Sequence, residues 1–108
     1  MEYTPQQVAA LVQDDDVQLI DVRTDPEVQA GRIDGGRHIE LIQLQGQVES
    51  IDRDRPVIFY CRSGGRSAMA TEAFRRAGFD AHNMTGGLVE WVQQGLPLDP
   101  PDGHVADH

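Results

Sequence analysis

Residues 57–67 of the sequence read Val57-Ile58-Phe59-Tyr60-Cys61-Arg62-Ser63-Gly64-Gly65-Arg66-Ser67. The first four residues are bulky β-formers, so they predict a buried strand that leads directly into Cys61. After a glycine-containing loop, apolar residues at helical spacing predict a helix from about Ala68 to Ala77, which Gly78 ends. A strand joined to a helix by such a short loop is typical of α/β folds with a parallel sheet.

The sequence on either side of this unit continues the alternation of helices and strands. Thr4 and Gln7 form a capping-box pattern around Pro5, which predicts a helix over residues 5–14. The β-branched run at 17–22 predicts a buried strand. The remaining expected elements are a helix from residue 25 that Gly31 ends, a short strand at 38–39, an amphipathic helix over 41–51, a strand over 79–84 and a short helix around 88–92.

These elements predict one domain over residues 1–98, with an α/β fold whose central sheet is mostly parallel and carries helices on both faces. The segment 99–108 contains two prolines and no large apolar side chain, so we expect it to be a disordered tail. Ligands of open parallel sheets bind beyond the carboxyl ends of the strands. Cys61 follows a predicted strand at such a position.

The chain is acidic. Eighteen acidic residues against nine basic ones, all arginine, give a formal net charge of −9. Such a balance disfavours nucleic acid and anionic membranes as partners. No stretch approaches the ~20 apolar residues of a membrane span, and the N-terminus lacks the basic and apolar regions of a secretory signal. We therefore expect a cytoplasmic protein.

Cys61 is the only cysteine, which excludes an internal disulfide and a multi-thiolate zinc site. A lone cysteine is either a small buried hydrophobe or a reactive thiol. Here the backbone N–H groups of the loop and the start of the next helix can surround an anionic sulfur, and two nearby arginines add positive charge. This context favours a reactive thiolate. His38 and His82 share no metal-like spacing with the cysteine, which argues against a metal site.

Four segments resemble those of single-domain rhodanese-like proteins. Residues 61–67 resemble the C-R-x-G-x-R-S active-site loop of that family, and residues 19–23 look like its L-I-D-V-R strand. Residues 27–36 are similar to its E…G-H-I-x-G-A segment, and residues 84–91 resemble its C-terminal L-x-G-G-x-x-x-W signature. Each piece is short, but the ordered set is specific and covers nearly the whole chain up to Leu98.

Three departures from the family pattern lie outside the cysteine loop. Arg32 stands where the family usually has histidine, Gly36 where alanine is common, and Glu40 where proline often follows isoleucine. They bear on the local shape of residues 32–40 and leave the catalytic inference unchanged.

The resemblance implies a rhodanese-like three-layer fold with about five strands, and a sulfurtransferase that carries sulfur as a persulfide on Cys61. It implies that Arg62 orients a small anionic donor such as thiosulfate, and that Arg66 either does the same or braces the loop by pairing with an internal carboxylate. The acceptor would be cyanide or a thiol, and a sulfur-carrier protein is a further candidate partner. The expected binding loop comprises Arg62, Ser63, Gly64, Gly65, Arg66 and Ser67. No metal or organic cofactor is expected.

Several residues outside the loop have structural interpretations. By resemblance, Asp21 is a structural carboxylate near the site. Arg23 and Glu27 are expected to pair with each other, Ser67 to cap the helix that follows the loop, and Trp91 to belong to the core.

Three rival functions differ in what they require of the cysteine loop. A phosphatase or arsenate reductase of the related fold uses a C-x5-R loop, whereas here Arg66 is five positions after Cys61 and position six is Ser67. A non-catalytic rhodanese-like module that only binds partners usually lacks the cysteine. A sulfur relay accepts persulfide sulfur from a partner protein and works poorly with thiosulfate.

Overall fold

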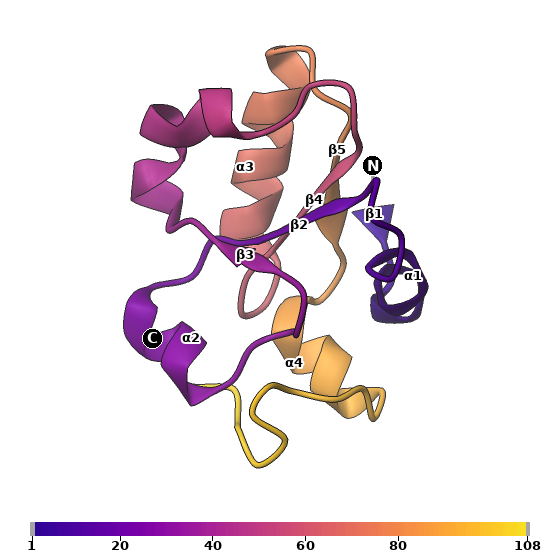
Figure 1. Ribbon diagram of the computed structural model, residues 1–108. Coiled ribbons are helices and arrows are strands. Elements are labelled where there is room, and N and C mark those ends of the chain that lie inside the picture. The colour runs from indigo at the N-terminus through magenta and orange to yellow at the C-terminus, as the bar shows by residue number, and fades with distance from the viewer. Residues whose placement is uncertain (1, 108) are drawn as a thin grey trace.

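A computed structural model describes residues 2–107 as a five-stranded parallel sheet in the order β1-β5-β4-β2-β3 (Figure 1). The strands are β1 Glu2–Tyr3, β2 Gln18–Asp21, β3 Arg37–His38, β4 Val57–Tyr60 and β5 Ala81–Met84. The helices are α1 Pro5–Leu11, α2 Asp25–Ala30, the 3₁₀ helix η1 Leu41–Ser50, α3 Gly65–Arg76 and α4 Gly87–Gln93. The predicted α/β class with a mostly parallel sheet of about five strands is confirmed.

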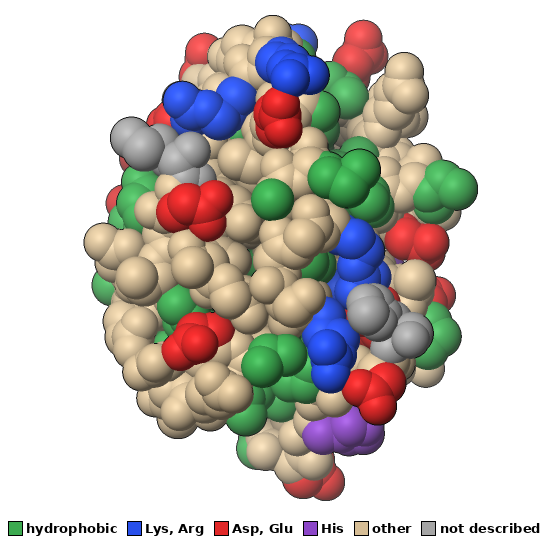
Figure 2. Space-filling model, turned by 180° about the vertical axis from the view of Figure 1, so that it is seen from behind, with side chains coloured by type: hydrophobic (Ala, Val, Ile, Leu, Met, Phe, Trp, Pro, Cys, Tyr) green, Lys and Arg blue, Asp and Glu red, His purple; other side chains and the backbone are tan. Residues whose placement is uncertain are grey.

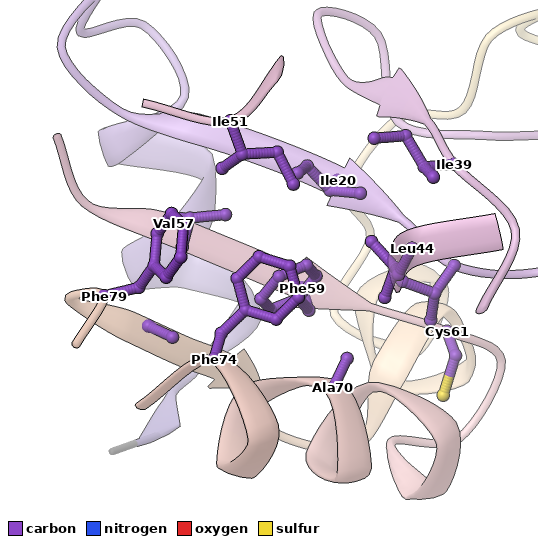
Figure 3. Close-up of a cluster of buried hydrophobic side chains, with 12 residues drawn as sticks. Ile20, Ile39, Leu44, Ile51, Val57, Phe59, Cys61, Ala70, Phe74 and Phe79 are labelled. Carbon is purple, nitrogen blue, oxygen red and sulfur yellow. The ribbon is translucent and has the colours of Figure 1, made fainter. Parts of the chain in front are cut away.

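Strand β4 is the middle strand of the sheet, and all four of its side chains are fully buried. Val57 and Phe59 belong to one buried cluster, which includes residues of η1 and α3 (Figure 3). Ile58 and Tyr60 belong to a second buried cluster, which includes residues of α1 and α4. Since neighbouring side chains of a strand point to opposite faces, the two clusters lie on the two faces of the sheet and make the fold three-layered.

The structure differs from the expected elements in three places. The segment 41–50 is a 3₁₀ helix and not an α-helix; its apolar residues include pairs three positions apart, which either helix type places on one side. Helix α3 begins at Gly65, before the expected Ala68, because Gly64 already takes the N-cap position. Strand β1 has only two residues, too few to give a sequence pattern.

The C-terminal segment 99–107 contacts the rest of the domain, and residue 108 of the tail expected to be disordered lies outside the described residues. Asp99 and Arg32 exchange two backbone hydrogen bonds of 2.7 and 3.1 Å, and the His104 N–H donates to the Ala30 carbonyl at 2.9 Å. Val105 packs against the second cluster. Backbone hydrogen bonds, which composition does not reveal, therefore hold this segment beside α2. None of the described helices has the length and apolar character needed to cross a membrane.

Candidate active site

Cys61 lies just beyond the carboxyl end of β4, beside the first turn of α3 (Figure 3). Three donors point at its sulfur: the Gly64 N–H at 3.1 Å, the Ser67 N–H at 3.5 Å and the Ser67 hydroxyl at 3.3 Å. The loop can close this tightly because Gly64 adopts a left-handed conformation with φ of 106°, which a side chain would strain. The loop is therefore a small cradle of hydrogen-bond donors around one sulfur atom.

The cradle is held from behind by the start of α4. The Leu88 N–H donates to the Cys61 carbonyl at 2.9 Å, and the Val89 N–H donates to the Arg62 carbonyl at 3.0 Å. The loop approaches so closely that a Cβ on Gly87 would lie 2.6 Å from both carbonyl oxygens. The glycine pair of residues 86–87 thus allows the C-terminal helix to dock on the loop.

The environment of Cys61 favours the thiolate. Burial by itself would raise the pKa of this thiol, but the hydroxyl and N–H of Ser67 and the N–H groups of Gly64 and Ser63 together lower it below the ordinary value. Arg66 contributes an electrostatic interaction with the same sulfur. The thiolate predicted from the loop is therefore supported mainly by close hydrogen bonds, with the guanidinium in a lesser role.

Ser67 does not cap α3 as expected. Gly64 is the N-cap, so Ser67 is the third residue of the helix, where it is fully buried. This position turns its hydroxyl toward Cys61 Sγ. The correction gives Ser67 direct contact with the sulfur, because a hydroxyl one turn into the helix reaches back over the N-terminus.

The guanidinium of Arg66 donates its side-chain hydrogen bonds to Glu27 and not to the Cys61 sulfur. Two bonds of 2.8 Å join its guanidinium nitrogens to the two carboxylate oxygens of Glu27, a side chain only 2 % exposed. Burial would raise the pKa of Glu27, but Arg66 and the N–H and hydroxyl of Thr24 lower it to about 2. Of the two predicted roles for Arg66, the geometry matches the bracing of the loop by an internal carboxylate.

Arg23 pairs with Asp21, which corrects the expected pair with Glu27. The guanidinium of Arg23 is fully buried and contacts both carboxylate oxygens of Asp21, with a shortest distance of 2.6 Å. It also donates to the backbone carbonyls of Gly31 and Glu27 at 2.8 and 3.3 Å. Arg23 therefore holds the middle and the C-terminal end of α2 through backbone carbonyls, which leaves the Glu27 carboxylate free for Arg66. Asp21 is the structural carboxylate that was expected.

Arg62 lies at the mouth of the loop, with its guanidinium against the C-terminal segment. It contacts the Asp107 carboxylate at 2.9 Å and donates to the Ala106 carbonyl at 3.3 Å. The Asp107 side chain is 94 % exposed, so water screens this pair. On the face drawn in Figure 2, acidic side chains are scattered, and some of the basic side chains lie next to hydrophobic ones.

The structure thus divides the predicted loop residues into two groups. Ser63, Gly64 and Ser67 supply donors to Cys61, whereas both arginines direct their guanidiniums at carboxylates. Gly65 begins α3, and a Cβ there would meet nothing within 4 Å.

Three contributors were missed by sequence reasoning. Asn83 donates to the Gly64 carbonyl at 3.4 Å, and its signal was an asparagine inside a buried strand, where this residue type is rare. Glu27 belonged to a recognised motif but was assigned another partner. The contact of Asp107 with Arg62 had no sequence signal. Residues 2–107 contain no cluster of three or more histidine, cysteine or acidic side chains arranged to hold a metal ion.

Comparison with known proteins confirms the family resemblance. The family described as Rhodanese-like domain matches residues 4–94. A sulfurtransferase of Allochromatium vinosum is 34% identical over 94 residues, which cover 86% of this chain and 88% of that protein. A thiosulfate sulfurtransferase of Glaesserella parasuis is 29% identical over 99 residues, which cover 91% and 92% of the two chains. The fold is similar to a rhodanese-related protein of Thermoplasma volcanium, with a TM-score of 0.83 at 24% identity over 90% of this chain and 95% of the other.

Proposed function

We propose a function for the Cys61 loop from the premise that the chain belongs to the rhodanese-like domain family of sulfurtransferases. Cys61 is the nucleophile and carries the transferred sulfur as a persulfide. The donor is a small anionic sulfane-sulfur compound such as thiosulfate, and the acceptor is cyanide or a thiol. We place this activity in the cytoplasm, where reducing conditions keep a lone thiol free.

In the first half-reaction, the Cys61 thiolate attacks the outer sulfur of thiosulfate. A sulfur–sulfur bond forms to Cys61, the sulfur–sulfur bond of thiosulfate breaks, and sulfite leaves with the bonding electron pair. The terminal sulfur of the new persulfide carries one negative charge, as the thiolate did before. A ring of N–H and hydroxyl donors that stabilises the thiolate suits this second anion for the same reason.

In the second half-reaction, cyanide or a thiolate attacks the terminal sulfur of the persulfide. The persulfide bond breaks, the acceptor leaves with the sulfur as thiocyanate or as a new persulfide, and the Cys61 thiolate is regenerated. Atoms, charge and electrons balance in both halves, so the steps need no external oxidant or reductant. The enzyme alternates between a thiolate form and a persulfide form, which predicts ping-pong kinetics.

The observation that carries this proposal is the set of three donors within 3.5 Å of Cys61 Sγ at the end of a central strand. The rival phosphoryl chemistry needs an arginine aimed into the pocket to grip a tetrahedral oxyanion. Arg66 is instead held in a two-bond pair with buried Glu27, and it follows the cysteine by five positions. These features favour sulfur transfer over phosphatase or arsenate reductase activity.

Intact-protein mass spectrometry tests the proposal directly. Incubation with thiosulfate should add the mass of one sulfur atom to the chain, and subsequent cyanide should remove it with release of thiocyanate. Because Cys61 is the only cysteine, Cys61→Ser should lose both the adduct and the turnover while its circular dichroism spectrum stays native. Thiocyanate production by the serine variant would refute covalent transfer through Cys61.

A sulfur relay from a partner protein is a second candidate, and one contact favours it. Asp107 engages Arg62, the basic group expected to attract thiosulfate. A partner persulfide does not depend on that attraction to the same degree, because protein–protein contacts position it. A relay predicts poor saturation by thiosulfate together with rapid loading from a persulfidated protein donor, measured by the same mass increase.

A further inference from the structure

The hydroxyl of Ser67 has one proton and two possible acceptors. Its Oγ lies 3.3 Å from Cys61 Sγ and also 3.3 Å from the Gly64 carbonyl oxygen. A hydroxyl donates only one hydrogen bond at a time, so whatever occupies the Gly64 carbonyl decides how often the proton points at the sulfur.

The Gly64 carbonyl already receives two other donors. The Ala68 N–H donates to it at 3.0 Å, as the first turn of α3 requires, and the Asn83 side-chain amide lies 3.4 Å away. A carbonyl oxygen has two lone pairs. The backbone N–H and the Asn83 amide fill both, which leaves the Ser67 proton for Cys61.

The orientation of the Asn83 amide is fixed by its surroundings. The same nitrogen that faces the Gly64 carbonyl lies 3.3 Å from a carboxylate oxygen of Glu2. Both neighbours accept hydrogen bonds only, so this terminal atom must be the NH₂ group. The opposite atom, Asn83 Oδ1, is buried without a hydrogen-bond partner, in a residue only 5 % exposed.

An unpartnered buried oxygen is unfavourable for folding. Asn83 therefore contributes less to packing than a leucine of similar size would, and its useful contact near the site is the one with the loop. We propose that Asn83 is a positioning residue, which occupies the Gly64 carbonyl and so directs the Ser67 hydroxyl at the Cys61 sulfur. This inference rests on the proposed function, because it concerns the reactivity of the same cysteine.

The test measures how the rate of Cys61 alkylation by iodoacetamide depends on pH, since only the thiolate reacts. Ser67→Ala removes the hydroxyl and should raise the midpoint of the profile by about one pH unit, as expected for one hydrogen bond to an anion. Asn83→Leu frees a lone pair on Gly64, so it should raise the midpoint by a similar but smaller amount. In the double variant, the midpoint should equal that of Ser67→Ala alone.

Two results would overturn the proposal. One is an unchanged midpoint in Asn83→Leu; the other is a double variant whose shift equals the sum of the two single shifts, because then Asn83 acts independently of the hydroxyl. Alkylation requires no sulfur donor, so a failure of the proposed sulfur transfer is measured separately, by the thiosulfate mass increase.

Controls separate positioning from a general loosening of the loop. Thr71→Val removes a hydroxyl that donates to the Ser67 backbone carbonyl at 2.8 Å, and it should leave the midpoint in place. Arg66 and Glu27 are the charged pair next to the cysteine and are the same in every variant, so their influence cancels. If circular dichroism shows that Asn83→Leu is unfolded, Asn83→Ala replaces it. The same upward shift of the alkylation midpoint is then expected, and the same two results would overturn the proposal.

Discussion

Replacement of Glu27 by glutamine should destabilise the domain in a way that depends on pH. The pKa of this carboxyl is lowered from 4.5 to about 2 in the folded protein. At about 1.36 kcal/mol per unit, that difference corresponds to about 3 kcal/mol of folding free energy at pH 7. The side chain is 2 % exposed, so solvent screening reduces this figure little.

The sign follows from the lowered pKa. The contribution of Glu27 is complete above its unfolded pKa of about 4.5 and is lost as the pH falls toward 2. The free energy of unfolding should therefore be about 3 kcal/mol lower for Glu27→Gln than for wild type at pH 7, and this difference should shrink to about half at pH 3. Urea unfolding followed by circular dichroism at several pH values measures both quantities.

A matched control uses a second glutamate–arginine pair, which lies within α3, the helix that carries Arg66. Glu72 and Arg76 form an exposed ion pair on α3, so Glu72→Gln should cost no more than about 0.5 kcal/mol. If Glu27→Gln cost as little as this control, or if the difference from wild type stayed constant between pH 7 and pH 3, the reasoning from the buried pair would be wrong.

Three further predictions concern the mouth of the loop, its rear contact and its selectivity. Asp107→Asn should lower KM for thiosulfate about two- to fivefold at low salt, the range of an exposed ion pair. Arg62→Ala should raise KM, and in its presence Asp107→Asn should no longer lower KM. An unchanged KM in both single variants would show that Arg62 does not bind the donor. Gly87→Ala should destabilise the domain by at least about 2 kcal/mol in urea unfolding, because its Cβ would lie 2.6 Å from two carbonyl oxygens. In the control Gly46→Ala, the new Cβ meets nothing within 4 Å, so the free energy of unfolding should change by no more than about 1 kcal/mol. Equal effects of the two variants would contradict the close approach of Gly87 to the loop. Aryl phosphate hydrolysis should not exceed the Cys61→Ser background, and robust Cys61-dependent hydrolysis would refute sulfur transfer.

The order of helices and strands was predictable because periodicity and turn residues mark each element locally. The strand 57–60 and its helix are clear from a run of β-formers and from apolar spacing. Two-residue strands such as β1 have no period to detect. The 3₁₀ geometry of η1 was also hidden, because pairs such as Leu41 and Leu44 lie on one side of either helix type.

The backbone of the site could be predicted from the sequence, but the hydrogen-bond partners of its side chains could not. Glycines and a strand–helix junction indicate a donor-lined loop around Cys61. The partner of Arg66 depends on how α2 is placed, and α2 is placed by Arg23, whose own partner is two positions away at Asp21. The Arg66–Glu27 contact joins residues 39 positions apart, and residue types alone do not specify it.

If Cys61 carries sulfur as proposed, the hydrogen bonds from Leu88 and Val89 to the carbonyls of Cys61 and Arg62 link the lifetime of that persulfide to the local opening of α4. While the first turn of α4 is closed, the rear of the loop is fixed and we expect the proposed persulfide to stay in its cradle. When that turn opens, the loop loses its support and solvent thiols can reach the sulfur. The exchange rates of these two amide protons with deuterium should therefore report how often the stored sulfur is exposed.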